Sequence, residues 1–212
     1  MQELVEQIKS AGIVPVVKID DAKDAVKLAA ALRNGGINCA EITFRTGAAK
    51  ESIRLISEEY PDMLIAAGTV LTVKQADDAI AAGAKFIVSP GLNPIVVKHC
   101  IEKGYPVIPG VCTPSEVEQA MSLGLTYLKF FPAEAAGGVK MIKAMAAPYT
   151  NIRFMPTGGI NTSNLADYLN CKAVFACGGS WMVPSDKIAD GKFDEIEKLT
   201  ADAVKLLKEI RK

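Results

Sequence analysis

Lys129 lies in a segment where a lysine is unexpected. Residues 127–132, Tyr-Leu-Lys-Phe-Phe-Pro, form a short apolar run closed by a proline, which indicates a buried β-strand. Most lysines are solvated, but an ammonium in such a strand loses its hydration, so it must be paired or lose its proton. An unprotonated lysine amine is a nucleophile that forms Schiff bases with carbonyl compounds. The segment therefore predicts imine chemistry, and a structural lysine is the alternative.

Residues 39–45 carry a second group of polar side chains in a strand-like run. Because side chains alternate along a strand, Glu41, Thr43 and Arg45 share one face and apolar residues occupy the other. A glutamate beside an amine nucleophile supplies the proton transfers that imine chemistry needs. We expect Glu41 to lie deep in the site and Arg45 at its rim. An internal ion pair between these two residues is the alternative.

Eight apolar segments recur along the chain, and each is followed by polar residues or glycines and then, in nearly every case, by an amphipathic stretch. Their starts lie about 20 to 26 residues apart, which fits one strand followed by one helix. Acidic or hydroxyl residues at Asp21, Thr72 and Thr113 mark helix starts, and the Gly35-Gly36 pair marks a helix end. The predicted strands are residues 13–18, 39–45, 64–70, 85–90, 106–111, 127–132, 152–157 and 173–178.

Alternating strands and helices imply a parallel sheet with right-handed crossovers, and eight such units close most naturally into a barrel. We therefore expect an α/β fold, a single (β/α)8 TIM barrel domain over residues 1–212 with a short N-terminal helix. An open doubly wound sheet is the alternative, and it is disfavoured because no Gly-x-Gly-x-x-Gly follows the first strand. Since helices cover the outside of a barrel, Glu41 and Lys129 should both point inward, with Phe131 as an apolar wall.

Barrels place their chemistry at the C-terminal ends of the strands. The third predicted strand ends at Thr69 and the fourth at Pro90. The seventh and eighth end in Thr-Gly-Gly at residues 157–159 and Gly-Gly-Ser at residues 178–180. Because glycines let backbone N–H groups approach an oxyanion, and Ser180 can donate its hydroxyl, we expect a phosphate site at these two strand ends.

Two residues near these strand ends allow more than one interpretation. Lys18, at the end of the first strand, either adds a positive charge to the same ligand or is a solvated loop residue. Trp181 is expected to pack rather than bind, and Ser180 could cap a short helix beginning there.

Composition and charge argue against several classes of function. The formal net charge is zero and no run of Lys and Arg stands out, so no nucleic-acid partner is expected. No apolar run approaches about 18 residues and the start of the chain has no apolar signal core, which predicts a cytoplasmic protein without a membrane partner. The five cysteines lack C-x-x-C spacing, and the single histidine, His99, is expected at the surface or a helix end. We therefore expect no metal and no other cofactor.

Six segments at the strand ends occur in order as EITFRT, AAGTVL, SPGLN, LKFFPAE, PTGGI and GGSWMVP. Together they resemble the 2-keto-3-deoxy-6-phosphogluconate (KDPG) aldolase family, whose members often also cleave 4-hydroxy-2-oxoglutarate (KHG). The likeness covers nearly the whole chain, and LKFFPAE with EITFRT is its most specific part. The resemblance implies a class I aldolase of the Entner–Doudoroff pathway on a (β/α)8 barrel, usually a homotrimer and without a metal.

By this resemblance Lys129 is the imine-forming residue and Glu41 the general acid/base, while Lys18 stands where the family often has arginine. The matching substrate-binding residues are Arg45 and Thr69 for the carboxylate region, Pro90 and Phe131 for the walls, and Thr157, Gly158, Gly159, Gly179 and Ser180 for the distal phosphate.

The implied reaction cleaves a keto-acid phosphate. Lys129 attacks the ketone of 2-dehydro-3-deoxy-6-phosphogluconate, and the resulting iminium accepts electrons as Glu41, directly or through a water, removes the hydroxyl proton. D-Glyceraldehyde 3-phosphate and pyruvate are the products, and KHG would give pyruvate and glyoxylate. Three alternatives stay open: an aldolase for 2-dehydro-3-deoxy-6-phosphogalactonate, a phosphosugar isomerase or epimerase on the same barrel, and a catalytically silent scaffold.

Overall fold

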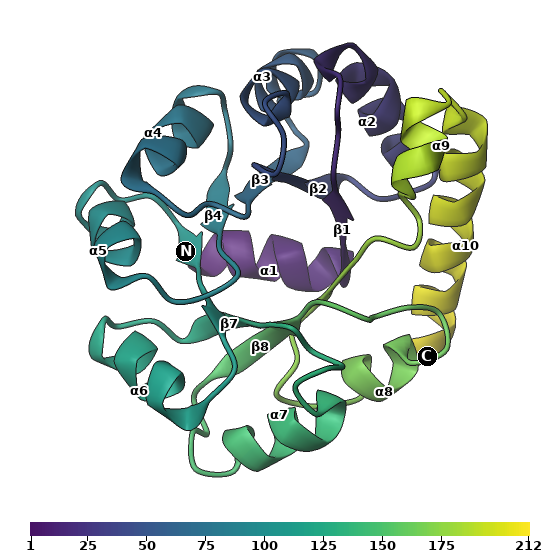
Figure 1. Cartoon of the computed structure of the whole chain (residues 1–212). Helices are drawn as coiled ribbons and strands as arrows, with labels where there is room; N and C mark the ends of the chain where they lie inside the picture. The colour runs from purple at the N-terminus through teal and green to yellow at the C-terminus, as the bar shows by residue number, and fades with distance from the viewer.

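Short parallel strands form a ring at the centre of the molecule, and helices surround it (Figure 1). The computed structural model describes residues 1–212. The strands are β1 (Ile13–Val17), β2 (Cys39–Thr43), β3 (Leu64–Gly68), β4 (Phe86–Val88), β5 (Val107–Ile108), β6 (Gly110–Val111), β7 (Tyr127–Phe130), β8 (Arg153–Pro156) and β9 (Cys177–Gly179). The helices are α1 (Gln2–Ala11), η1 (Ala22–Asp24), α2 (Ala25–Asn34), α3 (Ala49–Glu59), α4 (Val73–Ala81), α5 (Pro94–Glu102), α6 (Pro114–Ser122), α7 (Gly138–Ala146), α8 (Leu165–Leu169), α9 (Ser185–Ala189) and α10 (Phe193–Ile210).

The ring is a (β/α)8 barrel whose fifth strand is interrupted. Parallel pairing runs in the order β5-β4-β3-β2-β1-β9 and, separately, β6-β7-β8. β5 and β6 are two parts of one predicted strand, and Pro109 separates them because proline has no N–H for the ladder. The bridge Phe154–Val174 joins β8 to the segment before β9, and the bridge Thr157–Gly178 joins the residue after β8 to β9 itself. The predicted barrel is therefore confirmed.

The eighth strand begins later than predicted. The sequence indicates a strand over residues 173–178, but the regular ladder covers only Cys177–Gly179. The Val174 N–H donates to the carbonyl oxygen of Cys171 at 2.8 Å, so it serves a turn and not a ladder. The segment before Cys177 makes a single bridge with β8, in which the Ala173 carbonyl oxygen accepts from the Phe154 N–H at 2.7 Å and the Phe175 N–H donates to the Phe154 carbonyl oxygen at 3.1 Å.

Helix starts follow the predicted capping residues in two cases and shift in a third. Thr72 and Thr113 open α4 and α6 with capping boxes, in which each hydroxyl accepts from the third helical N–H. Asp21 accepts from the Lys23 N–H at 3.0 Å, but it opens the short η1 turn, and α2 begins only at Ala25.

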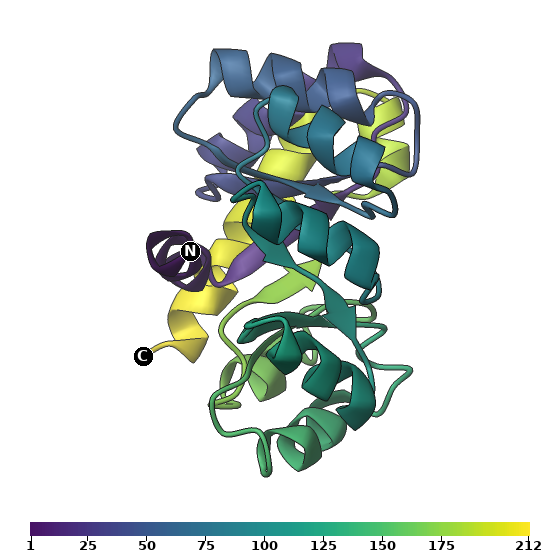
Figure 2. The same cartoon turned by 90° about the vertical axis from the view of Figure 1, so that its left-hand side faces the viewer.

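The two ends of the barrel differ, because α1 crosses one of them (Figures 1 and 2). Arg211, just after α10, donates to the carbonyl oxygens of Ser10 and Lys9 at 2.8 and 2.6 Å and so ties α10 to α1. Ile42 and Leu128, which alternate along their strands with Glu41 and Lys129, are fully buried. The C-terminal ends of the strands lie at the end away from α1, which is the mouth of the barrel. None of the helices combines the length and the apolar character needed to cross a membrane.

Candidate active site

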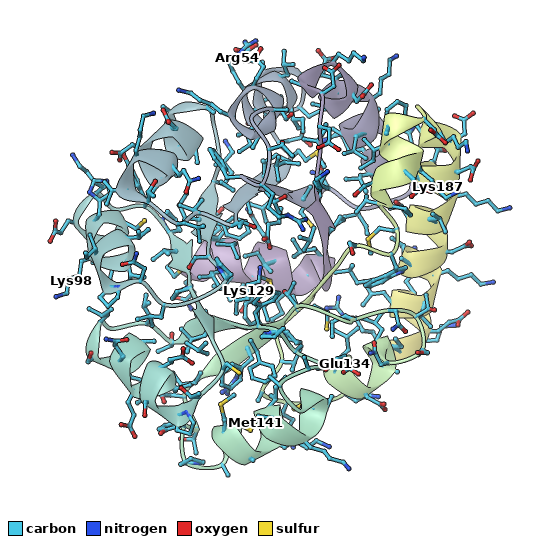
Figure 3. The ribbon with its side chains drawn as sticks, viewed as in Figure 1. Arg54, Lys98, Lys129, Glu134, Met141 and Lys187 are labelled. Carbon is cyan, nitrogen blue, oxygen red and sulfur yellow. The ribbon has the colours of Figure 1, made fainter.

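Lys129 and Glu41 form a buried ion pair inside the barrel. The Lys129 Nζ lies 3.1 Å from Glu41 Oε1 and 3.5 Å from Oε2, and the two side chains are 5% and 0% exposed. They come from β7 and β2, on opposite sides of the ring, and Lys129 lies near its centre in Figure 3. The alternative pair between Glu41 and Arg45 is wrong, because Glu41 is paired with Lys129 instead.

Two glycines in neighbouring strands allow close contacts at the site, Gly68 with Glu41 of the pair and Gly110 with the Pro90 backbone. Gly68 ends β3 beside Glu41, and a Cβ at that position would lie 2.0 Å from Glu41 Oε1. Gly110 stands in register with Lys129, and a Cβ there would lie 2.1 Å from the Pro90 carbonyl oxygen. The glutamate can therefore reach across the barrel only because the adjacent strand has no side chain at Gly68.

The pair has the parts that imine chemistry requires. The Glu41 carboxylate is within hydrogen-bonding reach of the amine and can accept its proton, which would leave a nucleophilic amine. The Phe131 ring centroid lies 5.4 Å from Lys129 Nζ, where its face attracts a cation. A cationic intermediate at Lys129 would thus have a carboxylate on one side and an aromatic ring on the other.

Arg45 lies at the rim and is anchored through Thr43. The buried Thr43 hydroxyl donates to the Val17 carbonyl oxygen at 2.7 Å and accepts from Arg45 Nε at 3.1 Å. Glu41 is fully buried whereas Arg45 is exposed, as strand alternation predicts. This leaves the terminal nitrogens of Arg45 available for a carboxylate, whose geometry they match.

The ends of β3 and β4 contribute two constrained segments. Thr69 has a φ of 55°, a left-handed conformation that β-branched residues rarely adopt and that tends to occur at functional sites. After β4, the Ser89 hydroxyl donates to the Gly91 carbonyl oxygen at 2.7 Å and closes a turn around Pro90. Both predicted residues, Thr69 and Pro90, therefore lie half-buried in constrained backbone just beyond the strand ends.

Backbone donors and one hydroxyl at the ends of β8 and β9 lack partners. Gly158 and Gly159 have φ values of 100° and 83°, and neither of their N–H groups donates a hydrogen bond within the chain. The buried Thr157 Oγ1 has no hydrogen-bond partner, and a Cβ on Gly178 would lie 2.4 Å from it. Unpaired buried polar groups are costly unless a ligand satisfies them, and successive free N–H groups suit an anion.

Two side chains near this region differ in part from expectation. Lys18 is 39% exposed and pairs with Asp20 at 2.8 Å, so its charge already has a partner. No helix begins at Trp181, because the Val183 N–H donates to the Ser180 carbonyl oxygen in a turn and α9 starts only at Ser185. Trp181 packs on Gly179, where a Cβ would lie 1.9 Å from its ring, and Ser180 is exposed.

His99 and the cysteines lie outside this site. His99 is in the last turn of α5, as expected, but its side chain is only 19% exposed and contacts Asp77 of α4 at 2.7 Å. The acidic partner is remote in sequence, which is why the sequence showed no acid beside the histidine. All five cysteines are free, and no group of three or more His, Cys, Asp or Glu residues could hold a metal ion.

A hollow of about 700 Å³ lies near the opposite end of the barrel, between α1 and the end of α10. Two cationic residues line it, Lys208 and Arg211, of which Arg211 already bonds the end of α1, and its Asp62 pairs with Arg33 at 2.8 Å. No buried acid–base pair lines it, so the chemistry points to the mouth instead.

Sequence reasoning missed a contact that borders the mouth. The Tyr168 hydroxyl donates to Glu134 Oε1, between α8 and the turn that follows β7. Glu134 belongs to the LKFFPAE segment and could have been suspected for that reason. Tyr168 carries no signal in the sequence, because only the fold brings α8 beside that turn.

Comparisons with known proteins agree with one another. A family model described as KDPG and KHG aldolase matches residues 4–199. The chain is 49% identical to the 2-dehydro-3-deoxy-phosphogluconate aldolase of Treponema pallidum, covering 98% of this chain and 99% of the relative. It is 45% identical to the KHG/KDPG aldolase of Escherichia coli K12, covering 94% of each. A crystal structure of KDPG aldolase from Legionella pneumophila, with pyruvate captured as a covalent carbinolamine, is similar with a TM-score of 0.91 at 39% identity, covering 94% of this chain and 97% of that one.

Proposed function

The chain belongs to the KDPG and KHG aldolase family, and we propose that Lys129 is its imine-forming nucleophile and Glu41 its general acid/base. The enzyme is a class I aldolase, a carbon–carbon lyase that cleaves 2-dehydro-3-deoxy-6-phosphogluconate. One observation carries the assignment of residues: Lys129 and Glu41 are buried together with their charged atoms 3.1 Å apart. Burying such a pair costs desolvation free energy, so its presence in a barrel core favours a functional role.

The proposed reaction begins when Glu41 accepts a proton from Lys129. The neutral amine attacks the substrate ketone to give a carbinolamine, and Glu41 returns its proton to the departing hydroxyl, so that water leaves, an iminium forms and Glu41 is again a carboxylate. Glu41 then removes the C4 hydroxyl proton, directly or through a water, and the C3–C4 bond electrons move into the iminium to give an enamine. D-Glyceraldehyde 3-phosphate leaves, the enamine takes up a proton at C3, and water releases pyruvate from Lys129.

The substrate-binding residues divide by the end of the substrate that they contact. Arg45 and Thr69 are assigned to the carboxylate region, supported by the anchored guanidinium and the constrained backbone at Thr69. Pro90 and Phe131 are assigned to the walls. The residues assigned to the distal phosphate are Thr157, Gly158, Gly159, Gly179 and Ser180, supported by the unpartnered hydroxyl and N–H groups at residues 157–159.

A second activity on KHG and the wider context are part of the proposal. The relative from Escherichia coli K12 bears both substrates in its name, and KHG would yield pyruvate and glyoxylate here.

We propose one domain over residues 1–212 that acts in the cytoplasm, where its five free cysteines would stay reduced. A homotrimer is proposed from the family resemblance, and the exposed side chains of Leu71 and Ile95 are available to a contact between copies. Light scattering on the purified protein tests the trimer.

Reductive trapping tests the nucleophile. Purified protein incubated with pyruvate and borohydride should acquire one irreversible pyruvyl adduct, and peptide mass spectrometry should map it to Lys129. The Lys129→Met variant should take up no adduct, whereas Lys18→Met should be labelled like the wild type. An adduct on another lysine, or none on the wild type, would reject the assignment.

Turnover measurements separate the substrates and the rival activities. We expect cleavage of the gluconate-series phosphate to be faster than cleavage of 2-dehydro-3-deoxy-6-phosphogalactonate, with KHG as a slower substrate. Release of pyruvate from each compound is measured with a coupled dehydrogenase. Faster galactonate-series cleavage would reassign the stereochemistry, and isomerisation of a phosphosugar without labelling of Lys129 would favour the isomerase alternative.

A further inference from the structure

A tyrosine–glutamate contact connects the two loops around the proposed phosphate site. The first loop, residues 131–137, follows β7, and the second, residues 157–164, follows β8. Glu134 belongs to the first loop, and Tyr168 lies in α8, directly after the second. Figure 3 shows Glu134 beside α8, between this helix and the centre of the ring.

The contact joins a buried donor to a more exposed acceptor. Tyr168 is fully buried, and its hydroxyl donates to Glu134 Oε1. Burial and the Glu134 carboxylate both raise the pKa of Tyr168, which keeps the phenol protonated and able to donate. A buried hydroxyl without this carboxylate would be an unsatisfied donor, so the fold favours Glu134 in this one position.

Backbone N–H groups of the first loop, at Glu134 and the residue before it, donate to carbonyl oxygens of the second loop. The Ala133 N–H donates to the Thr157 carbonyl oxygen at 2.8 Å, and the Glu134 N–H donates to that of Gly158 at 3.1 Å. The carbonyl oxygen of Gly159 accepts from Asn164 Nδ2 at 3.0 Å and from Asn161 Nδ2 at 3.2 Å. Three successive carbonyls are held in this way, whereas the N–H groups of Gly158 and Gly159 donate to no group within the chain.

Two glycines fit closely around the Glu134 side chain. A Cβ on Gly159 would lie 2.6 Å from Glu134 Cγ, and one on Gly138 would lie 3.2 Å from both Glu134 Oε1 and Tyr168 Oη. Both glycines also have left-handed φ values, 83° and 60°. The position of the Glu134 side chain is therefore coupled sterically to the conformation at Gly159.

We propose that Glu134 and Tyr168 are positioning residues that hold Gly158 and Gly159 in the conformation that receives the distal phosphate. The inference rests on the proposed function, because the glycines are assigned to the phosphate there. It predicts that loss of the contact raises KM for phosphorylated substrates and leaves the imine chemistry at Lys129 unchanged.

The variants Tyr168→Phe and Glu134→Ala test the proposal. Each should raise the KM for 2-dehydro-3-deoxy-6-phosphogluconate by roughly 3- to 10-fold, the effect of about one hydrogen bond, with kcat little changed. KM and kcat for KHG, which has no phosphate, should stay within about twofold, as should the rate of pyruvate trapping. Glu134→Gln keeps an oxygen that can accept from Tyr168 and should behave like the wild type. Tyr149→Phe is the matched control, because Tyr149 donates to Glu118 at 2.8 Å in another tyrosine–glutamate pair.

Binding measurements separate this proposal from the proposed function. Calorimetric titration with 3-phosphoglycerate, with glycerate as the unphosphorylated comparison, requires no cleavage, so it reports on the loops even if the wild type fails to trap pyruvate. The proposal is supported if Tyr168→Phe and Glu134→Ala bind 3-phosphoglycerate more weakly than the wild type does but bind glycerate equally well. The proposal would be overturned if Tyr168→Phe and Glu134→Ala raised KM equally for the phosphorylated substrate and KHG, or left both values unchanged. It would also be overturned if Glu134→Gln raised KM as much as Glu134→Ala. Glu134 is exposed, so its variants should fold even if Tyr168→Phe does not.

Discussion

The barrel mouth has two regions built from different groups, a charged side and a backbone side. On the charged side, Lys129 of β7 and Glu41 of β2 reach from opposite strands of the ring and pair with each other inside the barrel. On the side of β8 and β9, the site is mostly backbone, and Thr157, Gly158 and Gly159 offer donors that have no partner within the chain. The charged side is paired within the chain, whereas the backbone side leaves donors open to a ligand.

The difference follows from the cost of burying charge. An isolated buried ion is far more costly than an isolated N–H or hydroxyl, so a buried lysine needs a counter-ion within the chain, whereas neutral donors can stay without a partner until the phosphate binds. Changes on the charged side should therefore affect every substrate, and changes on the backbone side should affect only phosphorylated ones. The following predictions test that division.

Glu41→Gln should have the largest effect. The amide keeps the shape but cannot accept a proton, so kcat should fall by about 10²- to 10⁴-fold on both the phosphorylated substrate and KHG. Steady-state pyruvate release measures both values. Glu118→Gln, at an exposed helix position, is the control and should be close to the wild type. A loss restricted to one substrate would contradict the division between the two sides.

Gly159→Ala should impair the backbone side. Its φ of 83° disfavours a side chain and the new Cβ would press on Glu134, so KM for the phosphorylated substrate should rise by about tenfold or more. KHG turnover should change much less. Gly191→Ala is the control, because Gly191 also has a left-handed φ, 69°, but open space around it. An equal effect of the two variants on KM would show that strain alone is responsible.

Thr157→Val should separate binding from stability. The hydroxyl has no partner in the chain, so its removal should leave Tm unchanged or higher, while KM for the phosphorylated substrate rises by about 3- to 10-fold. Thr200→Val should lower Tm and leave KM unchanged, because the buried Thr200 hydroxyl donates to the Ile196 carbonyl oxygen at 2.7 Å. Thermal unfolding and KM are measured on both, and a lower Tm for Thr157→Val with unchanged KM would remove the hydroxyl from the phosphate site.

Thr43→Val should have the smallest effect. It removes the acceptor for Arg45 Nε, so KM should rise by about two- to fivefold for both substrates, which share the carboxylate. Thr43→Ser keeps the hydroxyl and should restore the wild-type value. An increase limited to the phosphorylated substrate would move Arg45 to the other side of the mouth.

The features that could be predicted from sequence are those with a short-range signal. Alternation in β2 and β7 indicated that Glu41 and Lys129 face inward, and the capping threonines Thr72 and Thr113 marked helix starts. The strand at residues 173–178 was misjudged because its apolar residues resemble a strand whether or not their N–H groups find a ladder. The Val174 N–H went to a turn instead, a competition that local sequence does not reveal.

By itself the sequence determined the barrel, the inward-facing charges and the glycine-rich strand ends, because periodicity and residue type depend only on neighbours along the chain. Only the tertiary structure decided which groups meet across the ring. Glu41 and Lys129 are 88 residues apart in the chain, and their 3.1 Å contact exists because closure of the ring places β2 opposite β7 and Gly68 leaves space between them. Tyr168 likewise reaches Glu134 only because α8 packs beside the turn after β7. Such contacts depend on the path of the whole chain.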